Sequence, residues 1–278
     1  MTQDTATESL RQDNVREAVR ERYASIALRD SDASGCGCTP TCCSSASEDA
    51  TTQLDETAYA EQLGYSANDT TAVPAGSNLG LGCGNPIAIA SIRAGETVVD
   101  LGSGAGFDCF LAANQLAGTG RVIGVDMTPA MISKARRNAA RSGHANVEFR
   151  LGEIEALPIA DGTADLIISN CVINLSPDKP RVFREAFRAL KPGGRLSISD
   201  VVARAPIPAS MREDFEQVTR CIAGAETIDD IRTWLAEAGF VDVRIAPRED
   251  SRKVIDTWMD GMRLGDIIVS ALIEARKP

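Results

Sequence analysis

From about residue 85 onward, the hydrophobic and polar positions follow two alternating patterns. Short apolar runs of strand length are separated by stretches whose apolar residues recur at helical spacing. Strands are predicted at 97–101, 121–127, 147–153, 164–170, 195–201, 241–247 and 266–275, and helices at 107–118, 128–143, 178–194 and 228–239. Elements that alternate in this way predict an α/β fold, a doubly wound Rossmann-like sheet with helices on both faces.

The segments before and after this region have different sequence patterns. Residues 8–29 predict one amphipathic helix, because their apolar positions are Val15, Val19, Tyr23, Ile26 and Ala27. The next stretch is rich in Ser, Gly, Thr and acid, which predicts a mobile arm that carries Cys36, Cys38, Cys42 and Cys43. The expected organisation is therefore helix and arm at 1–56, core at 57–205, and a C-terminal segment at 206–278 that completes the sheet.

Three further local patterns complete the secondary-structure prediction. The stretch "LKPGGRL" is typical of a helix stop followed by a turn, and it is assigned no chemistry. Beyond residue 206, helical segments are predicted through Cys221 and around Trp258.

Composition narrows the function classes. The 278 residues carry a net charge of -10, which argues against nucleic acid or an anionic membrane as the main partner. No apolar run approaches the roughly 18 residues of a membrane span, and the first residues lack the features of a secretory signal. The expected compartment is the cytoplasm, where thiols stay reduced and clustered cysteines more often bind or react than cross-link.

A glycine loop follows the first predicted strand. "VVDLGSGAGFD" places Gly102, Gly104 and Gly106 where the backbone can approach a ligand closely. The dinucleotide fingerprint requires glycine or alanine at its sixth position, and Phe107 stands there. Asp100, just before the loop, would repel a pyrophosphate but suits a cationic or amino-bearing ligand.

Acidic residues follow the next two strands. Asp126 ends the second strand, where a carboxylate can accept hydrogen bonds from both ribose hydroxyls. Glu153 and Ile154 follow the third strand, where an adenine would lie, although Glu153 can also be read as a solvated loop acid. Together these features favour a nucleoside ligand without phosphates, namely S-adenosylmethionine.

Cysteine occupies the end of the fourth strand, in "SNCVINLSPDKP". Cys171 is thereby expected beside the first strand, at the crevice where the sheet reverses direction and ligands bind. The chain has one histidine, His144, expected in a surface loop at the opposite edge, so the acceptor of a methyl group needs no nearby histidine base.

Two more cysteines have unusual sequence settings. Cys83 lies in the glycine-rich segment "NLGLGCGNP", and Cys221, in "VTRCIAGAE", could fold back over the crevice. Three thiols that converge on a sulfonium methyl group would suit a soft, thiophilic centre. The alternative for Cys83, Cys171 and Cys221 is a small core hydrophobe, which is also the reading of Cys109 on a buried helix face.

At this point the chain resembles a known family. The segments "NLGLGCGNP", "DLGSGAGFDCFLAA", "GVDMTPAMI", "SNCVINLSPDKPRVFREAFRALKPGGRL" and "CIAGA" are similar to the bacterial arsenite S-adenosylmethionine methyltransferases, over about residues 59–278. The cysteine contexts separate the chain from quinone-biosynthesis methyltransferases, which share the sheet. The resemblance implies a seven-stranded class I methyltransferase sheet whose last strand is antiparallel.

The resemblance also implies roles for individual residues. Cys83, Cys171 and Cys221 would bind trivalent arsenic, and an arm cysteine would form a disulfide with Cys83 during turnover. Cys43 is the choice for that partner, with Cys42, Cys36 and Cys38 open. The expected contacts of the methyl donor are Asp100, Gly102, Gly104, Asp126, Met127, Glu153, Ile154 and Asn170.

The implied activity is methyl transfer from S-adenosylmethionine to thiol-bound arsenite, for arsenic detoxification. Attack of an arsenic lone pair on the sulfonium methyl group requires that the two be correctly oriented, and it requires no base. Methylation oxidises arsenic, protein thiols can reduce it, and glutathione or thioredoxin would then clear the disulfide. Arsenite could arrive as a glutathione conjugate, and a monomer is the default state.

Two alternatives remain at this point. One is a methyltransferase for a small organic acceptor, which would survive replacement of Cys171 and Cys221 by serine. The other is a non-enzymatic binder whose arm holds zinc, an iron–sulfur cluster or arsenic. The arm spacing C-x-C-x3-C-C differs from the paired C-x2-C pattern of zinc sites, and the binder leaves the glycine loop unexplained.

Overall fold

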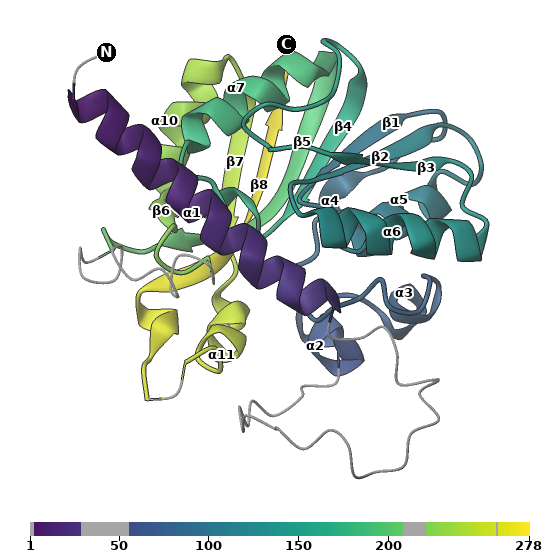
Figure 1. Cartoon of the computed structure of the whole chain (residues 1–278), viewed down its shortest axis with the longest axis horizontal. Coiled ribbons are helices and arrows are strands. Elements are labelled where there is room, and N and C mark those ends of the chain that lie inside the picture. Colours follow the sequence, from purple (N-terminus) through teal and green to yellow (C-terminus); the bar gives the residue numbers. More distant parts are fainter. Residues whose placement is uncertain (1–2, 29–55, 208–220, 260) are drawn as a thin grey trace.

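The core of the computed structural model is one twisted sheet flanked by helices (Figure 1). The structure describes all residues except 1–2, 29–55, 208–220 and 260. Within that part of the chain the strands are β1 (Thr97–Leu101), β2 (Arg121–Asp126), β3 (Val147–Leu151), β4 (Ala164–Asn170), β5 (Leu190–Ala203), β6 (Glu226–Thr227), β7 (Val241–Pro247) and β8 (Ile268–Arg276).

The strand order confirms a doubly wound sheet. Neighbouring strands follow the path β3-β2-β1-β4-β5-β8-β7, and the short β6 pairs with β5 outside this path. Strands β1 to β5 pair in parallel, whereas β8 runs antiparallel to both β5 and β7. The path has the seven predicted strands, and the last strand is antiparallel as expected. The sheet reverses direction between β1 and β4, so ligands are expected at the carboxyl ends of these two strands.

The helices divide between the two faces of the sheet and its edges. They are α1 (Gln3–Leu28), α2 (Glu56–Gln62), α3 (Ala67–Thr71), α4 (Ile87–Ala90), α5 (Phe107–Gln115), α6 (Pro129–Ser142), α7 (Lys179–Ala189), α10 (Ile228–Ala238) and α11 (Arg252–Ile255), with a 3-10 turn η1 at Ile173–Leu175. None of the described helices has both the length and the apolar character required to cross a membrane.

Strand β1 carries apolar side chains on both faces, as expected for an inner strand of a parallel sheet. Val98 packs in a cluster with α4, α5 and α6, whereas the next residue, Val99, packs in a cluster with α7 and α10. Both side chains are fully buried. The helices therefore cover the two sides of the sheet, and its strand ends remain for a binding site.

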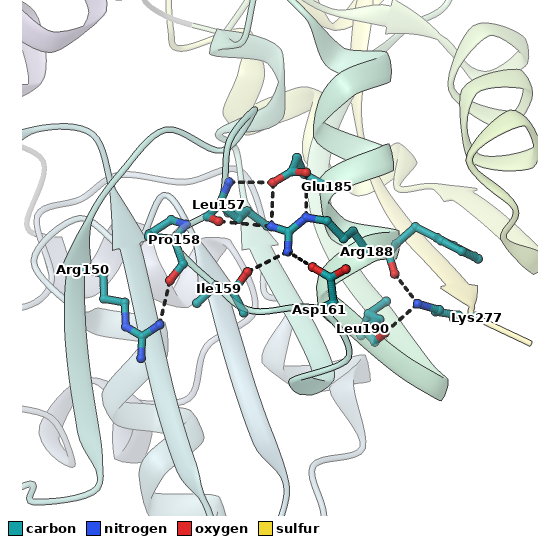
Figure 2. A network of polar contacts seen from close by, with 10 residues as sticks. Arg150, Leu157, Pro158, Ile159, Asp161, Glu185, Arg188, Leu190 and Lys277 are labelled. Atoms are coloured by element: carbon teal, nitrogen blue, oxygen red, sulfur yellow. Dashed lines mark hydrogen bonds and ion pairs between the residues drawn. The ribbon is translucent and has the colours of Figure 1, made fainter.

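Helix α7 is joined to the loop before β4 by a polar network, shown in Figure 2. Arg188 donates hydrogen bonds to the backbone carbonyls of Leu157 and Ile159 and pairs with Asp161 and Glu185. Glu185 in turn accepts a hydrogen bond of 2.8 Å from the backbone N–H of Leu157. These contacts fix the path of the chain between β3 and β4, and thus the start of the strand that ends at the candidate site.

Two local predictions were wrong. The "LKPGG" segment continues as strand, because β5 begins at Leu190 and the segment pairs with the end of the chain. Gly193 donates to Lys277 O at 2.9 Å, and Lys277 donates to Gly194 O at 2.9 Å, so backbone pairing overrides the local turn signal. Cys221 lies in a turn rather than a helix, and most of the predicted helix before it falls outside the described residues.

Candidate active site

A cavity of about 970 Å³ opens at the carboxyl ends of β1, β2 and β4. The glycine loop after β1 forms one wall, and the segment from Asn170 to Pro177 contributes to another. The remaining walls come from segments distant in sequence: α1, the residues around Leu81, and the stretch that ends at Trp258. A cavity of this size accommodates a nucleoside-sized ligand together with a second small molecule.

The glycine loop approaches both the cavity and the segment after β4. Gly102 has a φ of +71°, and a Cβ added to it would lie 2.4 Å from Val172 Cγ2, so this position requires glycine. The neighbouring Ser103 lines the cavity, and its buried hydroxyl has no hydrogen-bond partner among the described residues. A buried polar atom without a partner is expected to meet a ligand or water, so the loop fits a polar ligand.

Asp126, at the end of β2, closes the same part of the cavity. Its carboxylate accepts hydrogen bonds from the backbone N–H groups of Gly104, at 3.0 Å, and Thr128, at 2.8 Å. Burial raises the pKa of Asp126 above its ordinary value. Met127 and Ile154 line the cavity beside it. This arrangement holds a hydrogen-bond acceptor at the sheet edge where a ribose is expected.

Two more carboxyl groups are buried beneath the glycine loop. Asp100 accepts a hydrogen bond from the thiol of Cys109 at 3.2 Å, and burial, with Asp108 nearby, raises its pKa well above the ordinary range. Asp108 accepts hydrogen bonds from Tyr65 Oη at 2.6 Å and from Asn170 Nδ2 at 3.2 Å. Burial nevertheless raises the pKa of Asp108 to about 6. Two neighbouring buried carboxyl groups make this part of the cavity suited to a ligand that carries positive charge.

The raised pKa of Asp108 predicts a pH-dependent stability. A carboxyl group that binds its proton more tightly in the folded state stabilises the fold at low pH, and this contribution is lost as pH rises through the folded pKa. With a pKa near 6 against 3.8 unfolded, Asp108 is expected to contribute about 1 kcal/mol more at pH 5 than at pH 7. Urea unfolding of the wild type and of Asp108→Asn at both pH values measures this difference. An equal pH effect in both proteins would contradict the assignment.

Three cysteines meet at the other end of the cavity. The thiol of Cys221 donates a hydrogen bond to Cys171 O at 2.9 Å, and the thiol of Cys83 donates one to Ser199 O at 3.6 Å. Candidate ligand atoms of Cys83, Cys171 and Asp200 all lie within 4.8 Å of one another. Cys83 and Cys221 are buried, and Cys171 is partly exposed. The cluster therefore joins sulfur atoms from three separate segments of the chain.

Backbone strain and close packing hold these segments together. Cys171 and Cys221 have φ values of +59° and +65°, a region that residues other than glycine seldom adopt. A Cβ on Gly224 would lie 1.9 Å from the carbonyl oxygen of Asn174, so the Cys221 turn packs directly on the segment after Cys171. Strained residues of this kind gather at functional sites, because the surrounding structure must enforce them.

The electrostatics of the cluster keep the thiols protonated. Burial raises the pKa of Cys83 to about 11, and the pKa of Cys221 lies well above its ordinary value because of its hydrogen bond to Cys171 and its burial. Burial also raises the pKa of Asp200 to about 6, although the carboxylate accepts hydrogen bonds from Ile173 and Asn174. The cluster does not resemble the activated thiolate of a cysteine nucleophile, and it suits instead a thiophilic centre that displaces the thiol protons.

The predicted site residues occupy different positions around the cavity. Nine of them line it: Asp100, Gly102, Gly104, Asp126, Met127, Ile154, Asn170, Cys171 and Cys221. Cys83 is not among the lining residues and lies against Cys171. Glu153 is directed to α1, where it pairs with Arg20 at 3.5 Å. Cys43 and the other arm cysteines lie outside the described residues.

Asn170 connects the strand end to the Cys83 segment. Its Oδ1 accepts a hydrogen bond from the backbone N–H of Cys83 at 3.1 Å, and its Nδ2 donates to Gly84 O at 2.8 Å. The amide thus positions a thiol as well as lining the cavity, a role that the sequence does not indicate. His144 lies partly exposed in a surface loop, as predicted, and its ring contacts Ser142 and Asn114.

Sequence reasoning missed Asp200 and the aromatic wall of the cavity. Asp200 lies in β5, beside β4, so the same strand-end argument that found Cys171 could have indicated it. Tyr23, Tyr59 and Trp258 line the cavity near the thiols. Tyr23 was predicted only as an apolar position of a helix, because no sequence signal places that helix over the strand ends.

Comparison with known proteins assigns the chain to a family. Residues 92–239 match the model of a methyltransferase domain. An arsenite methyltransferase of Halobacterium salinarum is 52% identical over 272 residues, which cover 96% of this chain and 67% of that protein. The chain belongs to the arsenite methyltransferase family. An arsenite methyltransferase of Aquipseudomonas alcaligenes is 42% identical over 192 residues, or 66% of this chain and 54% of the relative.

The solved structures agree with this family assignment. An arsenic(III) S-adenosylmethionine methyltransferase from Chlamydomonas reinhardtii superposes with a TM-score of 0.60 and 34% identity, over 80% of this chain and 73% of that one. A geranyl diphosphate C-methyltransferase from Streptomyces coelicolor, in complex with S-adenosyl-L-homocysteine, has a TM-score of 0.58 at 20% identity and shows the shared fold. The predicted class I methyltransferase fold and the predicted family are thus confirmed for this member of the arsenite methyltransferase family.

Proposed function

We propose that the protein transfers methyl groups from S-adenosylmethionine to arsenite bound by Cys83, Cys171 and Cys221. The observation that carries this proposal is the position of three cysteines at one end of a cavity whose other end has the glycine loop and Asp126: the Cys83 and Cys171 sulfurs lie within 4.8 Å of each other, and the Cys221 thiol donates a hydrogen bond to Cys171 O. Family membership supports the same reaction, because the related proteins are named arsenite methyltransferases. Neither half of the cavity alone would distinguish this activity from other methyl transfers.

The residues around the glycine loop fit the methyl donor. Asp126 would accept hydrogen bonds from the ribose, and the hydroxyl of Ser103, without a partner among the described residues, would meet a polar group of the ligand. The buried Asp100 and Asp108 favour a positively charged ligand. When bound there, S-adenosylmethionine supplies an electrophilic methyl group on a sulfonium.

The thiols would hold the substrate by exchange of protons for sulfur–arsenic bonds. Arsenite carries three hydroxyl groups, and three thiols displace them as water, so no net charge develops in the buried cluster. This balance suits Cys83, Cys171 and Cys221, whose pKa values are raised and which therefore carry their protons at neutral pH. Trivalent arsenic then keeps a lone pair that can attack the methyl group, and the chain need only orient it.

The proposal extends to the reductant. Methylation takes two electrons from arsenic, and two thiols return them when they form a disulfide. We assign this step to Cys83 and an arm cysteine, Cys43 as the first choice, with glutathione or thioredoxin to restore the thiols. Glutathione conjugates of arsenite would also be substrates, because thiolates exchange readily on arsenic.

The test is transfer of labelled methyl groups from S-adenosylmethionine to arsenite, with glutathione present and the full-length protein as enzyme. Methylated arsenic is the expected product. A folded protein that binds S-adenosylmethionine but yields no methylated arsenic would contradict the proposal and favour an organic acceptor. Arsenite binding without S-adenosylmethionine binding would favour a non-enzymatic binder.

A further inference from the structure

Cys83 lies in a segment that is neither helix nor strand, so its position depends on contacts with its surroundings. Two side chains hold its backbone. Asn170 Oδ1 accepts a hydrogen bond from the N–H of Cys83 at 3.1 Å, and the hydroxyl of Ser270 donates one to Cys83 O at 2.6 Å. Asn170 ends β4 and Ser270 lies in β8, and these strands pair with opposite edges of β5. The backbone of Cys83 is thus held from both sides of β5.

Ser270 is itself fixed in the sheet. The residue is 1% exposed, and it pairs with Val201 of β5. Its backbone N–H donates a hydrogen bond to Ser251 Oγ at 3.0 Å, and its carbonyl oxygen accepts one from the N–H of Arg248 at 2.7 Å. Because the backbone of Ser270 is held in this way, its hydroxyl oxygen can occupy few positions, and the carbonyl that it contacts is held in turn.

The residue after Cys83 packs on the same two strands. A Cβ added to Gly84 would lie 2.1 Å from Ser199 Oγ and 3.4 Å from Ser270 Oγ, so a larger residue would push the segment away from β5 and β8. The carbonyl oxygen of Ser199 accepts a hydrogen bond of 2.8 Å from the N–H of Cys171 and one of 3.6 Å from the thiol of Cys83. One residue of β5 therefore contacts both cysteines, and displacement of Cys83 from these strands would change the separation of the two sulfur atoms.

We propose that Ser270 is a positioning residue of the arsenite site, whose hydroxyl holds the carbonyl of Cys83 and thereby places the Cys83 sulfur where it can share an arsenic atom with Cys171. This inference rests on the proposed function. The two sulfur atoms lie within 4.8 Å of each other. Small displacements of the Cys83 backbone therefore decide whether one arsenic atom can bind both, and residues behind the ligands commonly set this geometry.

A hydrogen bond to the backbone suits a ligand that must exchange its proton for arsenic. The thiol of Cys83 makes a long hydrogen bond, of 3.6 Å, to Ser199 O. This bond is lost when arsenic replaces the thiol proton. The hydrogen bond from Ser270 to Cys83 O stays, because neither of its atoms takes part in the exchange. Ser270 can therefore hold Cys83 in the same place before and after arsenite binds.

The experiment compares Ser270→Ala with Ser197→Ala in the full-length protein, with the four arm cysteines changed to serine so that arsenite can bind only the remaining thiols. Ser197 is the matched control, because it is a buried serine of β5 whose hydroxyl donates a hydrogen bond of 2.7 Å to Pro86 O, three residues after Cys83. Arsenite affinity is measured by tryptophan fluorescence, since Trp258 lines the cavity. Ser270→Ala is expected to weaken arsenite binding about tenfold, and Ser197→Ala less than about threefold.

A double-mutant cycle separates positioning from a general loss of stability. In the Cys83→Ser background, Ser270→Ala is expected to change arsenite affinity less than about twofold, because the sulfur that it positions is absent. The urea midpoints of Ser270→Ala and Ser197→Ala are expected to fall by similar amounts, since each variant removes the donor to one carbonyl. Both variants are expected to bind S-adenosylhomocysteine as the parent protein does, because neither serine lines the cavity.

Three outcomes would overturn the inference. They are unchanged arsenite affinity in Ser270→Ala, an equal loss in Ser197→Ala, and an equal effect of Ser270→Ala with and without Cys83. Failure of the parent protein, with Ser270 and Cys83 in place, to bind arsenite would instead contradict the proposed function, and this inference with it.

Discussion

Cys171→Ser is expected to lower the rate of arsenite methylation at least about a hundredfold while leaving the fold and the methyl-donor affinity intact. Cys171 is the central member of the cluster, because its sulfur lies within 4.8 Å of the Cys83 sulfur and its carbonyl oxygen accepts a hydrogen bond from the Cys221 thiol. Serine has nearly the same shape but offers a hard oxygen, which binds a soft trivalent centre far more weakly than sulfur does. Transfer of methyl groups from labelled S-adenosylmethionine measures the rate, and the affinity for S-adenosylhomocysteine shows whether the methyl-donor site is intact.

The matched control for this prediction is Cys109→Ser. Cys109 is a buried cysteine of α5, but its thiol contacts Asp100 and is not part of the thiol cluster. Its substitution is expected to change arsenite affinity less than about threefold. Full arsenite methylation by Cys171→Ser would contradict the assignment of Cys171 as an arsenic ligand. An equal loss of arsenite affinity in Cys109→Ser would show a general effect of thiol removal.

Gly224→Ala has the second largest expected effect, although it removes no functional group. A Cβ at this position would lie 1.9 Å from Asn174 O and 2.9 Å from the carbonyl carbon, and backbone atoms cannot give way as a flexible side chain can. The Cys221 turn must therefore separate from the segment after Cys171. We expect a loss of about 1–3 kcal/mol in the free energy of unfolding and a fall of about tenfold or more in arsenite affinity.

Gly162→Ala is the comparison for Gly224→Ala. Gly162 has a positive φ of +58°, unlike Gly224, and a Cβ there would meet nothing within 4 Å. Its substitution is expected to cost about 1 kcal/mol of backbone strain and to leave arsenite affinity unchanged. Urea unfolding of the two variants measures the change in stability, and arsenite titration measures the change in affinity. Wild-type arsenite affinity in Gly224→Ala would show that the spacing of the two cysteine segments is unimportant.

Sequence reasoning was most accurate where local pattern and final environment agree. Strands β4 and β7 have the predicted bounds, because their residue types and flanking turns alone define them. The position of Cys171 also followed, since a parallel sheet brings its strand ends to one edge. The same reasoning failed at Leu190 to Gly194, where pairing with Lys277, far along the chain, outweighs a strong local turn signal.

The remaining parts of the site depend on contacts that no local pattern specifies. Cys221 reaches Cys171 because its turn packs on Asn174 through Gly224, a contact between segments about 50 residues apart. Its position was expected from the family resemblance, whereas periodicity had suggested a helix. Tyr23 could be placed on the apolar face of a helix, but its packing against the cluster that contains Cys221 depends on how α1 docks on the sheet.

The most direct measurement of the central claim is X-ray absorption at the arsenic edge. It requires the full-length protein with Cys36, Cys38, Cys42 and Cys43 changed to serine, so that arsenite can bind only the remaining thiols. We expect three sulfur neighbours and no oxygen around arsenic, and one sulfur fewer when Cys171 is also changed to serine. Arsenic that keeps oxygen neighbours in the presence of Cys83, Cys171 and Cys221 would contradict the three-thiol site.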